Sequence, residues 1–376
     1  MKKSLLITLD FTPAVGGTAA YYKNICDHFP KNDIHILAPD IAYHEIADQK
    51  IQYSVHRKKM ISESWYVWPK WKLALAETEK IIKAERIEAL LVGNILPCGT
   101  IALFLKKKLR VPYFVFIHGM DLSMLRGRKK ILAKKILQES SKVFTNSNYT
   151  KHLVESFGIS EDRIITAYPC PNPLPEPDEL DIIKMRNAHD LHDRKILLTV
   201  GRLVERKGHD MVLRAMPEAI KKYENLTYII AGDGPNKNNL KNLAKNLNIE
   251  NNVIFIEKPM DKEISCLYFL CDAFIMVSRK LHNHDYEGFG IVYLEANAFS
   301  KPVIAGKSGG VTEAVQNQVN GILVDPENLK EISDAILHLL DNPHYAHILG
   351  MQGLDRLHHK FQWWEQAKKI ENAINI

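Results

Sequence analysis

The segment YPCPNPLPEPD (168–178) decides how the chain is divided. Its five prolines exclude a helix and the interior of a sheet, and they favour an extended connector. On both sides of this segment, short apolar runs alternate with longer amphipathic runs, which is typical of a parallel sheet with helices on both faces. The sequence therefore predicts an α/β protein with two doubly wound, Rossmann-like domains, one at 1–172 and one at 190–359, joined by a linker at 173–189.

The short apolar runs are the expected strands, and a last amphipathic run is an expected helix at 360–376. In the first half, the expected strands lie at 4–9, 33–38, 89–93, 113–118, 142–147 and 163–168. In the second half, they lie at 195–201, 226–234, 252–257, 273–278, 302–306 and 321–325. Ligands of open α/β sheets bind at the carboxyl ends of the strands, so we expect the functional residues in strand-to-helix loops around a cleft between two facing domains.

Length and composition agree with this division. The 376 residues exceed the size of about 250–300 residues that a single core usually reaches. Apolar residues make up 46% and charged residues 25%, as in ordinary soluble proteins. No apolar run approaches the roughly 18 residues of a membrane span, and the opening apolar run is too short for a convincing signal peptide. Five cysteines without a C-x-x-C pair indicate neither a zinc ribbon nor a disulfide framework, so we expect a cytoplasmic protein.

Positive charge is concentrated in the first half, where residues 1–170 hold 26 Lys and Arg against 16 Asp and Glu. The basic clusters are HRKK (56–59), KKKLR (106–110) and RGRKKILAKKIL (126–137). The last cluster has apolar residues at helical spacing, which allows peripheral binding to an anionic membrane on its cytoplasmic face. A solvated helix with an ordinary apolar face explains the same pattern. We do not expect nucleic acid as a partner, because no recognition motif accompanies the charge.

Two loops of the first half carry candidate residues. In DFTPAVGGTAAYY (10–22), Gly16 and Gly17 open a helix, where backbone N–H groups can bind phosphate or simply form a tight turn. In HGMDL (118–122), His118 ends an apolar strand, where it can hydrogen-bond a sugar hydroxyl, act in acid-base chemistry, or have a structural role. On the acceptor side we expect Asp10, Asp121 and Tyr149.

The loop GRLVERKG (201–208) is the strongest basic site in the second half. Arg202 and Lys207 can converge there with backbone amides at the start of a helix, which suits an anion with two phosphates. The planar donor fork of Arg202 and the point charge of Lys207 can stabilise negative charge on a departing diphosphate.

Three further patterns superficially resemble ligand sites. Gly232 in AGDGPN (231–236) follows an expected strand, but the third glycine of a dinucleotide fingerprint is missing, which favours a close-approach turn. GKS (306–308) is not a phosphate loop, because Lys301 stands where that motif requires glycine. A metal site at His282, His284 and Asp285 has no supporting partner spacing, so we predict no metal.

The segment EGFGIVYLE (287–295) combines acidic residues with flexible backbone. Gly288 and Gly290 free the backbone at a helix start near Ile291, with Phe289 between them. Glu287 and Glu295 stand eight residues apart, so we expect their carboxylates on one side, with the intervening amides turned toward phosphate. Two surface glutamates in salt bridges are the plainer alternative, which leaves the GFG segment unexplained.

Taken together, these motifs resemble those of the family 4 glycosyltransferases of the GT-B fold over nearly the whole chain. The motifs that carry the resemblance are VGGTAA, HGMD, VGRLVERKG, AGDGP, EGFGIVYLE, SGGVTEAV and NGILVDP. The resemblance implies a retaining, metal-independent hexosyltransferase without a cofactor, which moves a sugar from a nucleoside-diphosphate sugar to a glycan or lipid-linked acceptor. It also implies that the final helix at 360–376 packs back on the N-terminal domain.

The resemblance assigns roles to individual residues. It implies that Glu287 contacts the donor sugar and Glu295 the ribose, that Arg202 and Lys207 bind the diphosphate, and that His118 is the N-domain active-site histidine. The expected donor-binding set is Gly16, Gly17, Arg202, Lys207, Gly232, Glu287, Gly288, Phe289, Gly290, Ile291 and Glu295, and the expected catalytic set is His118, Arg202, Lys207 and Glu287.

The segment SRKLHNHDYEGFGIVYLEANA (278–298) is similar to bacterial GDP-mannose-dependent mannosyltransferases, so mannose is the favoured hexose. Two departures from the family pattern stand out. PCPNPLPEP replaces the usual PNG-V-D turn, and Glu257 stands where the turn near the nucleobase usually has glycine, which leaves the base open. A nucleotide-sugar 2-epimerase and a non-catalytic nucleotide-sugar-binding protein of the same fold are the alternative functions.

Overall fold

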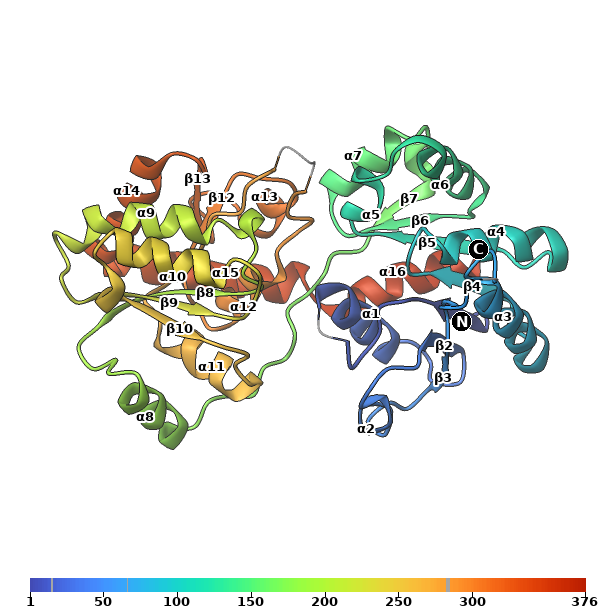
Figure 1. Ribbon diagram of the computed structural model, residues 1–376, viewed down its shortest axis with the longest axis horizontal. Coiled ribbons are helices and arrows are strands. Elements are labelled where there is room, and N and C mark those ends of the chain that lie inside the picture. The colour runs from blue at the N-terminus through green and yellow to red at the C-terminus, as the bar shows by residue number, and fades with distance from the viewer. Residues whose placement is uncertain (15, 66, 282–284) are drawn as a thin grey trace. The chain divides into compact units, whose positions relative to one another are not determined.

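The computed structural model describes residues 1–14, 16–65, 67–281 and 285–376. These residues form two compact units (Figure 1). The first unit is Met1–Cys170 together with Gln362–Ile376, and the second is Pro171–Phe361. Each unit has its own sheet and its own hydrophobic core.

The described part of the first unit holds a seven-stranded parallel sheet in the order β3-β2-β1-β4-β5-β6-β7. Its strands are β1 (Ser4–Ile7), β2 (Ile34–Pro39), β3 (Ser54–Lys58), β4 (Ala89–Val92), β5 (Tyr113–Ile117), β6 (Val143–Thr145) and β7 (Ile164–Thr166). Most of these runs are fully buried because helices cover both faces of the sheet. The edge strand β3 (SVHRK) was not expected from the sequence, because it lies half-exposed and has no apolar run.

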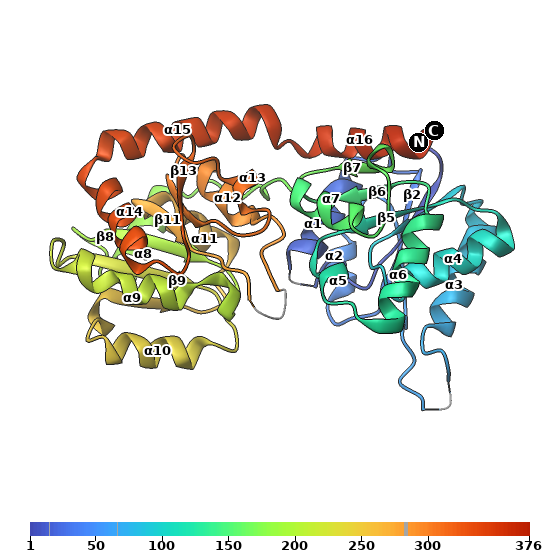
Figure 2. The same cartoon turned by 90° about the horizontal axis from the view of Figure 1, so that it is seen from above.

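The helices of the first unit connect successive parallel strands (Figures 1 and 2). They are α1 (Gly17–Asp27), α2 (His44–Asp48), α3 (Lys72–Glu85), α4 (Cys98–Leu109), α5 (Met120–Ser123), α6 (Gly127–Glu139) and α7 (Asn148–Glu155), and the last helix of the chain, α16 (Trp363–Asn375), joins them. Helix α16 packs against α1, where the Trp363 and Tyr21 ring centroids lie 5.6 Å apart. The buried Gln366 side chain also accepts a hydrogen bond from the Tyr168 backbone N–H (3.1 Å).

The described part of the second unit holds a six-stranded parallel sheet in the order β10-β9-β8-β11-β12-β13. Its strands are β8 (Lys195–Val200), β9 (Leu226–Ala231), β10 (Val253–Ile256), β11 (Ala273–Met276), β12 (Val303–Gly306) and β13 (Gly321–Val324). Its helices are α8 (Glu179–Ala188), α9 (His209–Ile220), α10 (Lys237–Asn246), α11 (Asp261–Leu270), α12 (Ile291–Ala298), α13 (Val311–Ala314), α14 (Leu329–Asp341) and α15 (Pro343–Lys360). The strand order reverses between β8 and β11, and the loops that follow these two strands are where a ligand is expected. Two doubly wound α/β units confirm the predicted fold class.

The connection between the units differs in one part from the predicted linker at 173–189. The proline-rich residues 169–178 form neither helix nor strand, in agreement with an extended connector. Residues after them form α8, whose N-terminus is capped by the Asp178 carboxylate through the Asp181 backbone N–H (2.8 Å). Because α8 packs on α11, this part of the predicted linker belongs to the second unit.

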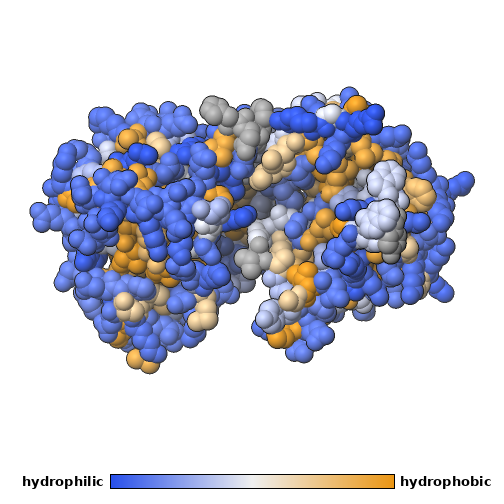
Figure 3. Space-filling model, viewed as in Figure 1, coloured by the Kyte–Doolittle hydropathy of each residue, from blue (hydrophilic) through white to orange (hydrophobic). Residues whose placement is uncertain are grey.

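In the described ranges, none of the helices has the length and hydropathy needed to cross a membrane. Hydrophilic residues cover most of the face shown in Figure 3, with smaller hydrophobic patches between them.

Candidate functional site

The candidate donor site of the second unit is built from the loops that follow β8 and β11, which are neighbours in the sheet. The loop after β8 runs through a short 3₁₀ turn at Glu205–Lys207 into α9. The loop after β11 leads to Glu287 and then into α12. Adjacent parallel strands thus bring together two segments that are far apart in the sequence, as the sequence predicted for functional loops.

Glu287 is the centre of a compact ion-pair cluster. Its Oε2 atom lies 2.6 Å from the Lys207 Nζ and 2.6 Å from an Arg206 guanidinium nitrogen. The Arg206 Nε lies 3.0 Å from the Asp285 carboxylate, and the Arg206 carbonyl accepts a hydrogen bond from the Arg279 backbone N–H (2.9 Å). The side chains of Lys207 and Glu287 are each 12% exposed, so the cluster is well shielded from water.

The cluster keeps Glu287 ionised. Burial alone would raise the pKa of Glu287, but the charges of Lys207 and Arg206 and their hydrogen bonds outweigh burial and lower it to about 2. The carboxylate therefore accepts hydrogen bonds at every physiological pH, and it is a weak base.

The sequence did not single out Arg206. Arg202 and Lys207 were the cations of this loop expected to bind a diphosphate. Arg202 is exposed and makes no ion pair with any residue in the described part of the chain. The adjacent cations Arg206 and Lys207 in VERKG were the available signal, but nothing in the sequence shows that both of them reach Glu287.

Glu295 lies in a different environment. It is 9% exposed on α12, and its Oε2 atom accepts a hydrogen bond from the Tyr268 hydroxyl of α11 (3.1 Å). Burial raises the pKa of Glu295 to about 7, although this hydrogen bond opposes the shift. The two glutamates of the EGFGIVYLE segment therefore differ in charge behaviour near neutral pH.

The GFG segment between them is tightly packed. Gly290 precedes α12 with φ 92°, and a Cβ atom there would lie 2.4 Å from the Tyr293 ring, so only glycine fits. The Phe289 side chain is buried and its ring centroid lies 5.7 Å from that of Phe361. Because the Phe289 side chain is buried, only the backbone of Phe289 is expected to contact a donor. Gly288 has no side chain, so the same holds for Gly288. Ile291 is the first residue of α12.

Gly232 lies at the carboxyl end of β9 and supports the cationic loop. A Cβ atom on Gly232 would lie only 2.0 Å from the carbonyl oxygen of Gly201, so a side chain at position 232 would clash with the backbone. Gly201 is the residue before Arg202. The segment Ser308–Gly310 similarly supports Glu287, because the Gly310 backbone N–H donates to the Glu287 carbonyl (3.0 Å).

The first unit holds the other predicted residues. His118 follows β5, and its Nε2 atom lies 2.8 Å from the hydroxyl oxygen of Tyr22 on α1. Burial lowers the pKa of His118 to about 4, so the imidazole is neutral at physiological pH. Gly16 caps the N-terminus of α1, and Gly17 is the first residue of that helix.

Two of the three predicted acceptor-side residues, Asp121 and Asp10, accept hydrogen bonds within the first unit. Asp121 accepts a hydrogen bond from the Gly119 backbone N–H (2.9 Å), and burial raises its pKa to about 6 against the effect of its backbone hydrogen bonds. Asp10 accepts a hydrogen bond from the Asn94 side-chain amide (2.8 Å). Tyr149 is half-buried on α7. Asp121 thus holds the turn that follows His118.

Of the three residues considered as a metal site, His282 and His284 lie outside the described residues, and Asp285 is described. Asp285 forms the ion pair with Arg206 described above. Within the described ranges, no three His, Cys, Asp or Glu side chains form a group that could hold a metal ion.

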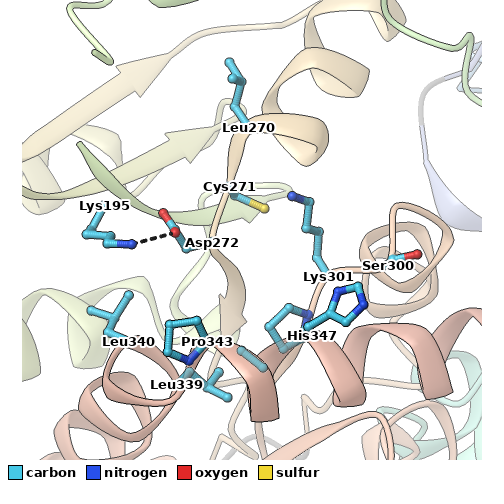
Figure 4. A pocket seen from close by; sticks show the side chains of 12 residues that line it. Lys195, Leu270, Cys271, Asp272, Ser300, Lys301, Leu339, Leu340, Pro343 and His347 are labelled. Carbon is cyan, nitrogen blue, oxygen red and sulfur yellow. Dashed lines mark hydrogen bonds and ion pairs between the residues drawn. The ribbon is translucent and has the colours of Figure 1, made fainter. Parts of the chain in front are cut away.

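A separate cavity of about 280 Å³ lies at the opposite edge of the second sheet (Figure 4). It is lined by Lys195 and Asp272, which form an ion pair of 3.4 Å, and by Lys301 and His347. Lys195, Asp272 and Lys301 lie at or near the amino ends of β8, β11 and β12, and His347 lies on α15. The cavity is therefore distinct from the Glu287 cluster, which lies beyond the carboxyl ends.

Two protein families match the chain. The model described as Glycosyltransferase Family 4 matches residues 15–172, and the model described as Glycosyl transferases group 1 matches residues 181–356. Together the two matches cover most of both units.

Curated relatives match the chain over its whole length. A GDP-mannose-dependent alpha-(1-6)-phosphatidylinositol monomannoside mannosyltransferase of Mycolicibacterium smegmatis is 28% identical, with 99% of this chain and 98% of the relative covered. A GDP-mannose-dependent monoacylated alpha-(1-6)-phosphatidylinositol monomannoside mannosyltransferase of Corynebacterium glutamicum is 26% identical, with 99% and 98% covered.

Solved structures share the fold at lower sequence identity. Anabaena Alr3699/HepE in complex with UDP and glucose has a TM-score of 0.84 at 18% identity, and all of both chains is covered. Sucrose-phosphate synthase from Thermosynechococcus elongatus has a TM-score of 0.80 at 18% identity, with 98% of this chain and 97% of that chain covered.

Proposed function

Because the chain belongs to the family 4 glycosyltransferases of the GT-B fold, we propose that it is a retaining hexosyltransferase. It moves a hexose, with mannose favoured, from a nucleoside-diphosphate sugar to a hydroxyl of a glycan or lipid-linked acceptor. The favoured sugar rests on the relatives that are named as GDP-mannose-dependent mannosyltransferases. The chemistry is proposed to need neither a metal nor a cofactor.

The observation that carries the proposal is the contact of Lys207 and Arg206 with Glu287 beyond the neighbouring strands β8 and β11. An acidic group for a sugar and cationic groups for a diphosphate thus stand side by side. We propose that the donor diphosphate binds Arg202 and Lys207 near the N-terminus of α9, where backbone N–H groups add positive potential.

In the proposed reaction, the acceptor hydroxyl attacks the anomeric carbon from the face that the diphosphate leaves. The bond from the anomeric carbon to the diphosphate oxygen breaks, and a leaving phosphate oxygen takes the proton of the attacking hydroxyl. Arg202 and Lys207 stabilise the negative charge that develops on the diphosphate. The proposal therefore uses no covalent protein nucleophile.

Glu287 and His118 have different proposed roles in this reaction. Glu287 is ionised because its pKa is about 2, so it can accept hydrogen bonds from sugar hydroxyls and stabilise positive charge at the anomeric carbon. His118 is neutral and binds the sugar from the first unit. The buried Glu295 is proposed to bind the ribose, together with the backbone of Gly288, Phe289 and Gly290.

Peripheral contact with an anionic membrane is proposed for the first unit, and helix α6 is the surface proposed to make it. In the cluster at 56–59, the buried Arg57 pairs with Asp48 (2.7 Å). In the cluster at 106–110, Lys106 pairs with Glu139 and Lys108 with Glu79. In the same cluster, Lys107 and Arg110 are exposed and make no ion pair with a described residue, and helix α6 holds more such cations. Its cations that are exposed and make no ion pair with a described residue are Arg128, Lys129, Lys130, Lys134 and Lys135.

Exposed apolar side chains of the first unit support the same proposal. Ile131 on α6 is 71% exposed, and Trp65 and Trp68, between β3 and α3, are 90% and 86% exposed. The segment before α3 extends away from the sheet (Figure 2), and its base is closed by the hydrogen bond from the Ser62 backbone N–H to the Lys70 carbonyl (2.8 Å). Tryptophan prefers the interface between lipid and water, and lysine is attracted to anionic lipid.

The proposed donor is tested by thermal shift with GDP-, UDP- and ADP-sugars. A donor that binds only the folded protein raises its melting temperature by mass action, and we expect the largest rise with GDP-mannose. No rise with any nucleotide sugar would contradict the proposed donor site.

The proposed reaction is tested with the nucleotide sugar that gives the largest rise. A transferase retains the anomeric configuration in an acceptor product and gives only slow hydrolysis when the acceptor is omitted. A new nucleotide sugar formed without an acceptor would instead identify an epimerase.

A further inference from the structure

His118 has one hydrogen-bond partner for its imidazole ring among the described residues. The Nε2 atom lies 2.8 Å from the hydroxyl oxygen of Tyr22, a residue 96 positions earlier in the chain. The same hydroxyl lies 2.5 Å from the carbonyl oxygen of Gly93, which follows β4. Three groups from α1, β4 and β5 therefore form a short chain of hydrogen bonds.

The direction of each hydrogen bond follows from the number of protons. The Gly93 carbonyl can only accept, so the single proton of the Tyr22 hydroxyl points to Gly93. The Tyr22 oxygen must then accept a hydrogen bond from His118, which requires a proton on Nε2. If Tyr22 donated to His118 instead, its oxygen would face the Gly93 carbonyl oxygen at 2.5 Å without a proton between them.

Both side chains remain uncharged at physiological pH. Burial lowers the pKa of His118 to about 4 and raises the pKa of Tyr22 well above its usual value. A neutral imidazole carries one proton, so a proton on Nε2 leaves a lone pair on Nδ1.

We propose that Tyr22 is a positioning residue that fixes the Nε2–H tautomer of His118 and so makes Nδ1 a hydrogen-bond acceptor. The ligand group that fits Nδ1 is a hydroxyl that donates a hydrogen bond. Naming this ligand as the sugar of the donor rests on the proposed function, whereas the tautomer rests only on the contacts within the first unit.

The neighbouring Tyr21 provides a matched control. Its ring centroid lies 5.1 Å from that of His118, compared with 5.3 Å for Tyr22, and both tyrosines are buried on α1. The Tyr21 hydroxyl also donates to a backbone carbonyl, that of Ala167 (3.1 Å), but it makes no hydrogen bond to His118. Tyr21→Phe therefore removes a comparable hydrogen bond without touching the imidazole.

The tautomer is measured by long-range ¹H–¹⁵N NMR of the full chain labelled at the histidine rings, with His118→Gln used to assign the signals. We expect wild-type Nε2 to carry the proton and Nδ1 to have the shift of an unprotonated nitrogen between pH 6 and pH 8. A proton on Nδ1 overturns the proposal. This result needs no variant of Tyr22, so it holds even if such a variant folds poorly.

The role of Tyr22 is measured with Tyr22→Phe and Tyr21→Phe in parallel. We expect Tyr22→Phe to change both ring-nitrogen shifts of His118 and Tyr21→Phe to leave them unchanged. Equal spectra for the two variants overturn the positioning role.

The catalytic consequence is measured as turnover of the nucleotide sugar. We expect Tyr22→Phe to be roughly fivefold to tenfold slower than Tyr21→Phe, which corresponds to one lost hydrogen bond. Equal turnover contradicts the role of Nδ1 in ligand binding. If the wild-type protein turns over no nucleotide sugar, the proposed function fails while the NMR result still decides the tautomer.

Discussion

The candidate residues of the two units differ in their electrostatics. In the second unit, Glu287 is ionised and lies 2.6 Å from each of two cations. In the first unit, the imidazole of His118 is neutral and its hydrogen-bond partner is the uncharged hydroxyl of Tyr22. In the proposed function, the cations of the second unit bind a diphosphate through fixed positive charge, whereas neutral His118 binds a sugar hydroxyl through a directional hydrogen bond.

The largest expected effect comes from removing a cation of the second unit. We expect Lys207→Ala and Arg202→Ala each to lower turnover by about 10²–10³, because each removes a preorganised cation from the leaving diphosphate. Lys207→Ala should also destabilise the fold, since it removes an ion pair with Glu287, whereas Arg202→Ala should not. Turnover assays and urea unfolding measure the two effects.

The control for these variants is Lys222→Ala, which removes an exposed lysine paired with Asp341. We expect it to change neither turnover nor stability appreciably. An Arg202→Ala enzyme with wild-type turnover would contradict the diphosphate role.

The next effect concerns the stability that Glu287 supplies. The folded protein lowers the pKa of Glu287 from 4.5 to about 2, so the ionised group stabilises the fold above pH 4.5 and this contribution is lost as pH falls toward 2. We expect Glu287→Gln to lower the free energy of unfolding by about 3 kcal/mol at pH 7, and by much less at pH 3. Urea unfolding at the two pH values measures the difference, and a deficit that does not depend on pH would count against the ion-pair explanation.

The dependence on pH should have the opposite sign for Glu295. Its pKa is raised from 4.5 to about 7, so the contribution of Glu295 to stability is fully present below pH 4.5 and is lost as pH rises through 7. We expect Glu295→Gln to stabilise the unliganded protein by at most about 3 kcal/mol at pH 8 and to have little effect at pH 4. Donor affinity should fall in the same variant, because a neutral amide replaces the carboxylate proposed to bind the ribose.

Thermal unfolding at pH 4 and pH 8, with and without donor, measures both effects of the Glu295 change. If Glu295→Gln is less stable than the wild type at pH 8, the ionised Glu295 carboxylate does not destabilise the fold as expected.

The smallest expected effect concerns the surface of the first unit. We expect the double variant Trp65→Ser, Trp68→Ser to bind anionic vesicles about tenfold more weakly, because two apolar side chains no longer enter the lipid interface. Trp364→Ser is the control, since Trp364 is also exposed but lies on α16. Vesicle sedimentation at low and high salt measures the binding.

If the double variant sediments with vesicles as the wild type does, the two tryptophans do not contribute to membrane binding. Failure of the wild type to sediment at low salt would remove the membrane proposal and leave the transferase proposal intact.

The sequence predicted the fold well because buried parallel strands appear as apolar runs between amphipathic helices. It failed at β3, a half-exposed edge strand with the polar sequence SVHRK, and at α8, which follows the prolines too closely to be separated from the connector. Both elements depend on tertiary contacts rather than on an apolar pattern.

The sequence also located the loops of the candidate site but not their contacts. The contacts of Glu287 with Arg206 and Lys207, and that of Glu295 with Tyr268 on another helix, were not predicted. The hydrogen bond from His118 to Tyr22 spans 96 positions. Spacing along a chain predicts which residues share a helix face, but it does not show which side chains meet across a sheet.

The placement of α16 has a practical consequence for dissecting the molecule. Residues 362–376 contribute the buried Trp363 and Gln366 to the first unit, although they follow the whole second unit in the chain. A stop codon after residue 361 would therefore damage the half of the protein encoded first, and a fragment ending at residue 170 would lack part of its own core. To be produced alone, the first unit needs residues 362–376 grafted behind residue 170.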